Sequence, residues 1–150
     1  MKQFLNLLIL ILLVGSLSFL QSWADFSVFG VKPNLALVAV IGAAFFSTNV
    51  LESFLLVAVA AFILKSGPDL KEILMFSIIG AGAIIIKRYL SWYPILSNLV
   101  LVSLGTLIFY VTLARDLIMT PLFLEELVLN LVGGLVFFAL LKFLWQNKSV

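Results

Sequence analysis

Long apolar runs, separated by short polar or turn-forming segments, dominate the chain. A helix that crosses a bilayer needs about 20 apolar residues, within a range of roughly 17–25. Most of the runs have about this length or are somewhat shorter, so the pattern predicts a bundle of transmembrane helices. The runs are Phe4–Leu20, Leu35–Leu64, Ile73–Ile86, Ile95–Ala114 and Leu127–Trp145.

The second run is too long for one crossing. As one helix it would extend about 45 Å at 1.5 Å per residue, whereas the hydrocarbon core is about 30 Å thick. Polar residues interrupt the run at Ser47–Asn49, and such side chains compete for backbone hydrogen bonds and favour caps and turns. We therefore predict a break there and an all-α fold of six short transmembrane helices. If the run is unbroken, the chain has five.

The segments between the runs carry turn and interface signals. The loop Asp25–Asn34 contains Pro33, which is expected to open the second helix because a proline lacks the N–H that a first turn leaves unpaired. Lys65–Asp69 is predicted to be a polar turn, and Tyr89–Pro94 an aromatic loop at the membrane interface. Pro121 is expected to open the last helix.

Composition agrees with the apolar pattern. Of 150 residues, 64% are hydrophobic and 11% are charged, whereas a soluble domain is about half apolar and a quarter charged. A soluble fold would lack the polar residues to cover its surface, but a bilayer accepts an apolar exterior. The length allows one domain, and the net charge of +2 is too small and scattered for a nucleic-acid partner. The chain has no cysteine and no histidine, which removes disulfides, the commonest metal ligand and the commonest general base.

The distribution of lysine and arginine predicts the orientation. Cytoplasmic loops carry the excess of basic residues, and six crossings with a cytoplasmic N-terminus give five basic residues inside and four outside. We therefore expect both termini in the cytoplasm. The inner set is Lys2, Lys87, Arg88, Lys142 and Lys148, and the outer set is Lys32, Lys65, Lys71 and Arg115.

The first run allows two interpretations. Lys2, the apolar run and the small residues around Trp23 fit a cleaved secretory signal. However, the run is longer than the roughly 7–15 apolar residues of such a signal, which favours an uncleaved membrane anchor.

No nucleotide loop, metal-ligand cluster or nucleophile–base pair stands out. Small residues within the runs, such as Gly80-Ala81-Gly82 and Gly133-Gly134, are expected to permit close helix packing. Glu52 is the only acid inside a long apolar run, and intramembrane acids are functional candidates by default. The break at Ser47–Asn49 favours the alternative that Glu52 lies near an interface, in the first turn of the third helix. Asn98 and Asn130 are expected to form hydrogen bonds between helices.

The run from Phe29 through Gly30, Lys32, Pro33 and Asn34 to Leu37 is similar to the Gly-hydrophobic-basic-Pro-Asp-Leu motif that follows the first helix in the rod shape-determining MreD family. Gln21, the basic stop Lys87-Arg88, and the last helix with Glu126, Leu129-Asn130 and Phe137-Phe138 also resemble the family. The chain departs from the family at Asn34, where Asp is usual, and at Ala60–Lys65, which lacks the family's Gly and Asp.

The resemblance implies a non-enzymatic component of the cell-wall elongation machinery in the bacterial inner membrane. It would bind an MreC-like bitopic protein and work with other elongation-complex proteins in the surrounding lipid, without a cofactor. The candidate residues for partner interaction are Gly30, Lys32, Pro33, Asn34, Asn98 and Asn130.

Two other classes compete with this scaffold. The first is a substrate-binding subunit of an energy-coupling-factor vitamin transporter, which is also a small six-helix protein but should present a polar pocket. The second is a membrane enzyme, which the lack of histidine and cysteine makes the weakest of the three.

Overall fold

The computed structural model describes residues 2–23, 25–64, 70–89 and 93–146, and the described part is all-α. It contains six α-helices and a short 3-10 helix, η1, which confirms the predicted helix number. The predicted turn at Lys65–Asp69 and the centre of the predicted aromatic loop, residues 90–92, lie outside the described residues. The helices are α1 Lys2–Ser22, α2 Leu35–Phe46, α3 Val50–Ile63, α4 Leu70–Tyr89, α5 Pro94–Leu113, η1 Arg115–Leu117 and α6 Pro121–Gln146.

The predicted break between the second and third helices is confirmed. α2 ends at Phe46, and α3 begins at Val50 after Asn49, whose side chain accepts the Glu52 N–H at 2.8 Å. Such a cap satisfies one of the four N–H groups that the first turn of a helix leaves unpaired. The alternative of five helices is therefore wrong.

Of the two prolines expected to open helices, only one is the first residue of its helix. Pro121 is the first residue of α6, as expected. Pro33 is not in α2, because Asn34 stands between them as the N-cap, with non-helical backbone and a side chain that accepts the Leu37 N–H at 3.1 Å. An asparagine is a preferred cap, so the side-chain hydrogen bond sets the start of this helix, and Pro33 only precedes it.

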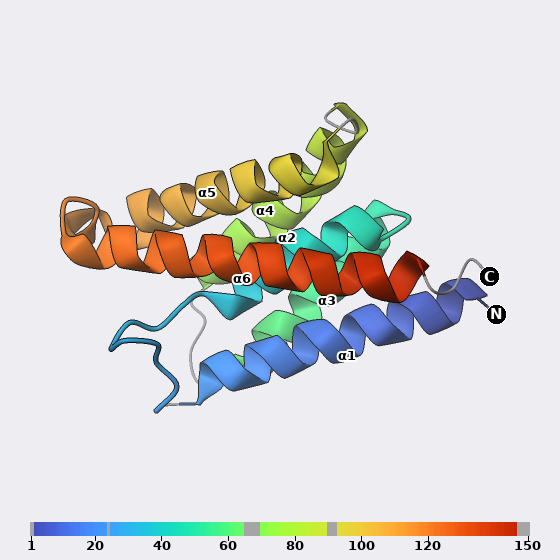
Figure 1. The fold of residues 1–150 in the computed structure, drawn as a ribbon, viewed down its shortest axis with the longest axis horizontal. Helices are drawn as coiled ribbons and strands as arrows, with labels where there is room; N and C mark the ends of the chain where they lie inside the picture. Colours follow the sequence, from blue (N-terminus) through green and yellow to red (C-terminus); the bar gives the residue numbers. More distant parts are fainter. Residues whose placement is uncertain (1, 24, 65–69, 90–92, 147–150) are drawn as a thin grey trace.

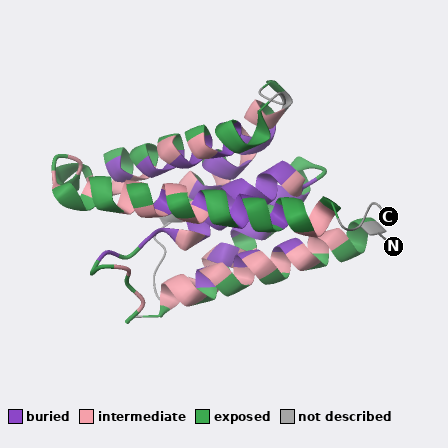
Figure 2. Cartoon of the chain, viewed as in Figure 1, coloured by how far each residue is buried: buried purple, intermediate pink, exposed green. Residues whose placement is uncertain are grey.

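α2 lies at the centre of the bundle (Figure 1). Ten of its 12 residues are buried, and α1, α3, α4, α5 and α6 all pack against it. A helix that is apolar on every side must be covered by protein or by lipid, and here protein covers it. Figure 2 shows this burial, with the centre of the bundle buried and the outer helix faces exposed.

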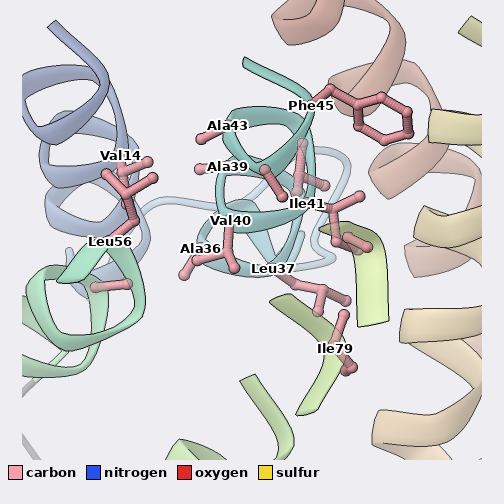
Figure 3. Packing of buried hydrophobic residues seen from close by; sticks show 14 of the residues in the cluster. Val14, Ala36, Leu37, Ala39, Val40, Ile41, Ala43, Phe45, Leu56 and Ile79 are labelled. Carbon is pink, nitrogen blue, oxygen red and sulfur yellow. The ribbon is translucent and has the colours of Figure 1, made fainter. Parts of the chain in front are cut away.

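Three alanines and three larger side chains lie on different sides of α2. Ala36, Ala39 and Ala43 point toward α1 and α3, which contribute Val14 and Leu56 (Figure 3). The larger Leu37, Ile41 and Phe45 point away from that side, and Leu37 approaches Ile79 of α4. The alanine side therefore permits a close approach of α1, and the large residues fill the wider space toward α4, α5 and α6.

Several glycines are points of close helix contact. A Cβ atom at Gly42 of α2 would lie 2.6 Å from Phe137 of α6, and one at Gly134 of α6 would lie 3.1 Å from Val102 of α5. Gly80 is similarly enclosed by Ser53 and Val40, but a Cβ at Gly82 would meet nothing within 4 Å. The predicted packing role is confirmed for Gly80 and Gly134. Gly133 has only ordinary contacts, since a Cβ there would lie 3.9 Å from Val38.

Among the described residues, three helices are long and apolar enough to cross a membrane, namely α1, α5 and α6, and the apolar exterior indicates a membrane protein. α2 and α3 have 12 and 14 residues, or about 18 and 21 Å at 1.5 Å per residue, which is less than the roughly 30 Å hydrocarbon core. α1 begins and α6 ends at the same end of the bundle (Figure 1). The loop between α1 and α2 lies at the opposite end, together with η1.

Candidate functional site

The loop between α1 and α2 contains a tight two-residue turn. Val28 and Val31 exchange two backbone hydrogen bonds of 2.8 and 3.0 Å, and Phe29 and Gly30 connect them. Both central residues have positive φ, 53° for Phe29 and 82° for Gly30, which is the signature of a type I′ turn. Glycine adopts this conformation without strain, whereas for a residue with a Cβ it costs about 1–2 kcal/mol.

The residues after the turn lead the chain into the bundle. Lys32 is exposed, whereas Pro33 and Asn34 are buried. The candidate residues of this loop therefore differ in environment. Gly30 and Lys32 lie on the surface, and Pro33 is buried.

Side chains from other helices satisfy the start of α2. The backbone N–H of Asn34 donates to Asn130 Oδ1 of α6 at 2.8 Å, and the N–H of Ala36 donates to Gln21 Oε1 of α1 at 2.6 Å. Together with the Asn34 cap, these bonds pair backbone donors that would otherwise be buried without partners. The helix can therefore begin inside the bundle instead of at its surface.

Polar contacts form a line between α5 and α6, which we name the α5–α6 polar seam. Asn98 Nδ2 donates to the Gly134 carbonyl at 3.1 Å, and Asn130 Nδ2 donates to Thr106 Oγ1 at 3.1 Å. The Tyr110 hydroxyl donates to the Glu126 carboxylate. The seam consists of Asn98, Thr106 and Tyr110 of α5 and Glu126, Asn130 and Gly134 of α6.

The seam confirms one sequence prediction and extends it. Asn98 and Asn130 do form hydrogen bonds between helices, and Asn130 also connects the seam to the start of α2 through Asn34. Sequence reasoning missed Thr106 and Tyr110. Their spacing from Asn98 by eight and twelve residues places all three on one helix face, which is a signal that could have found them.

Glu126 lies near the start of the last helix, where an acid can interact favourably with the helix dipole. In the structure it lies in the second turn of α6 and accepts the Tyr110 hydroxyl.

Glu52 belongs to a cluster at the opposite end of the bundle. Its carboxylate accepts the Thr48 N–H at 2.6 Å, the Thr48 hydroxyl at 2.7 Å and Gln3 Nε2 of α1 at 3.3 Å. Lys87 of α4 donates to the Ser47 carbonyl at 3.1 Å, next to the same turn. The placement of Glu52 in the first turn of α3 is confirmed. There the carboxylate ties the α2–α3 turn to α1.

Three buried polar atoms have no hydrogen-bond partner among the described residues. They are Asn98 Oδ1, Ser18 Oγ and Ser53 Oγ. A buried acceptor without a donor is unfavourable by about 1–3 kcal/mol. Asn98 thus uses its amide nitrogen to join α5 to α6 and leaves its oxygen inside the bundle.

Within the described ranges, the acids do not form a group of three or more that could hold a metal ion, and the chain has no histidine or cysteine. Comparison of the chain with protein-family models, with curated proteins and with solved structures gave no match.

Proposed function

We propose that the protein is a non-enzymatic membrane scaffold of the MreD type, which binds an MreC-like bitopic protein in the bacterial cell-wall elongation machinery. Both of its termini would lie in the cytoplasm. The sequence around Gly30, Pro33 and Asn34, which resembles that of the MreD family, supports this proposal.

The use of the interior polar groups is the structural observation that carries the proposal. Asn130 bonds to Asn34 and Thr106, Asn98 bonds to Gly134, and Gln21 bonds to Ala36. In lipid, such bonds and close packing hold helices together. Side chains that are already paired across helices favour a rigid scaffold over a protein with a polar substrate pocket.

A direct test is co-purification in mild detergent. The tagged chain, expressed in rod-shaped cells at native level, should retain the MreC-like protein of the same cells. Gly30→Val combined with Pro33→Ala should reduce that retention, because a β-branched residue is strained at the φ of 82° found for Gly30 and the start of α2 would shift. Gly82→Ala is the matched control, since its new Cβ meets open space. Full retention by the double variant at normal protein level would contradict a role of this loop.

One observation favours a second candidate, the substrate-binding subunit of a vitamin transporter. Asn98 Oδ1 is an unpaired acceptor inside the bundle, and the Glu126 carboxylate lies in the same seam. A water-soluble vitamin that raised the melting temperature of the purified chain, but not that of an Asn98→Leu variant, would favour the transporter. No response to thiamine, riboflavin or biotin would favour the scaffold.

A further inference from the structure

The tip of the α1–α2 loop presents a large apolar side chain away from the protein. Phe29 is 98% exposed, the highest value among the large hydrophobic residues that the structure describes. It also has a φ of 53°, in the left-handed region that residues with a Cβ avoid. The contacts within the chain therefore do not explain why a phenylalanine stands at this position.

The rest of the exposed loop is polar. Asp25, Ser27, Gly30 and Lys32 are exposed together with Phe29, whereas Val31 and Pro33 face inward and are buried. The exposed surface of the loop thus combines irregular backbone, two charged residues of opposite sign and one aromatic ring.

The depth of this loop follows from its hydrogen bonds. Asn34, the cap of α2, bonds to Asn130, which lies nine residues after Pro121, or about 14 Å along α6 at 1.5 Å per residue. The α5–α6 hairpin therefore continues well beyond the start of α2, as Figure 1 shows at the end that carries the loop. When α5 and α6 cross the bilayer, the part of the hairpin that extends beyond α2 lies in the membrane. The loop joins α2 at the same depth.

Lipid alone does not suit the loop, because the headgroup region favours tryptophan and tyrosine, whose rings carry a polar group, over phenylalanine, and hydrocarbon does not suit the backbone. Irregular backbone at membrane depth is tolerated where protein or water covers it, and not against hydrocarbon. Water alone does not suit it either, because a solvated type I′ turn favours Asn-Gly or Gly-Gly, and here an exposed phenylalanine takes the first position. A protein surface offers both an apolar pocket for the ring and hydrogen-bonding groups for the backbone.

We propose that Phe29 is an anchor residue for a protein partner, inserted into an apolar pocket of that partner at the end of its membrane-spanning segment. The turn holds the ring in place before the partner arrives, so that little conformational freedom is lost on binding. This inference rests on the proposed function only in that the chain binds another membrane protein. It adds the residue and the surface through which binding occurs.

A substitution that improves the turn and removes the ring separates binding from folding. Asparagine adopts positive φ more readily than phenylalanine, so Phe29→Asn should keep or raise the melting temperature of the purified chain. Retention of the bitopic partner should fall about tenfold, as expected when a buried aromatic ring is lost. Met119→Asn is the matched control, because Met119 is 94% exposed on the turn before α6 at the same end of the bundle, and it should retain the partner fully. Unchanged retention by Phe29→Asn would overturn the inference.

A second measurement does not depend on which partner is bound. The chain has no cysteine, so Phe29→Cys and Met119→Cys each provide one site for a membrane-impermeant maleimide. Position 29 should react in proteoliposomes of the purified chain and be protected in permeabilised cells, whereas position 119 should react in both. Protection of position 29 in proteoliposomes would mean that lipid covers it, and equal reaction in both settings would mean that water does. Either result overturns the inference and leaves the proposed function standing. Protection in cells without retention of the MreC-like protein would instead overturn that part of the proposed function.

Discussion

At the scale of single residues, Asn130 of α6 connects its own helix to two other elements. Its oxygen accepts the Asn34 N–H at the start of α2, and its nitrogen donates to Thr106 in α5. The side chain is fully buried, so water cannot replace these bonds within the folded chain. One amide therefore links the start of α2 to both helices of the α5–α6 hairpin.

Replacing this amide by an apolar side chain of similar size should destabilise the bundle. Asn130→Leu leaves the Asn34 N–H and the Thr106 hydroxyl without this partner, and we expect a loss of about 1–2 kcal/mol in the free energy of unfolding. Unfolding in mixed micelles with increasing SDS measures this loss. Thr112→Val is the control, because the exposed Thr112 hydroxyl bonds only to carbonyls of its own helix, Ile108 and Phe109, and should change stability by less than about 0.5 kcal/mol. If Asn130→Leu proved as stable as that control, the seam would contribute nothing to folding.

The sequence was sufficient to identify some of these residues but not their partners. Asn98 and Asn130 stand out because each is a polar residue inside an apolar run. Their partners depend on the register between α5 and α6 and on where α2 begins. Neither follows from the pattern along one helix, since Gly134 contributes only a backbone carbonyl and Asn34 only a backbone N–H.

At the scale of elements, the helix positions follow mainly from apolar length, and the helix ends from side-chain caps. The break between α2 and α3 was predictable because Ser47, Thr48 and Asn49 favour turns and caps. The start of α2 was predicted two residues too early, at Pro33 instead of Leu35, since Asn34 takes the N-cap position. The central place of α2 was not predicted. An all-apolar helix of this kind has no polar face that would reveal how many neighbours surround it.

The central place of α2 makes it sensitive to added volume. A Cβ at Gly42 would lie 2.6 Å from the Phe137 ring of α6, so Gly42→Ala forces the two helices apart. We expect it to lower the free energy of unfolding by about 1–3 kcal/mol, again measured by unfolding in mixed micelles. Adding Phe137→Leu should restore part of the loss, because the smaller side chain makes room for the methyl group.

Gly82→Ala provides the comparison for this prediction. The same change within α4 meets no atom within 4 Å. Since glycine is unfavourable inside a helix, Gly82→Ala should leave the free energy of unfolding unchanged or raise it by about 0.5–1 kcal/mol. Equal effects of the two substitutions would contradict the close contact between α2 and α6.

At the scale of the whole molecule, the two ends of the bundle differ in their chemistry. One end carries the Ser47–Glu52 turn, Lys87 and the last turn of α6. The other carries the α1–α2 loop and η1, with Lys32 and Arg115. The start of α1 and the end of α6 share the first end (Figure 1), as an even number of crossings requires. This arrangement is compatible with the orientation inferred from lysine and arginine.

That orientation predicts which positions a reagent can reach from outside the cell. Because the chain lacks cysteine, Arg115→Cys, Thr48→Cys and Gln146→Cys each place one thiol at a known end. A membrane-impermeant maleimide should label position 115 in intact cells, since basic residues are fewer on the outer side and α6 must cross from there to reach a cytoplasmic C-terminus. Positions 48 and 146 should be labelled only after permeabilisation. Reporter fusions made after Lys65 and after Lys87 should correspondingly report opposite sides of the membrane. Labelling of positions 48 and 146 from outside, with position 115 protected, would show that the molecule is inserted the other way. Fusions that reported the same side would show that α4 does not cross the bilayer.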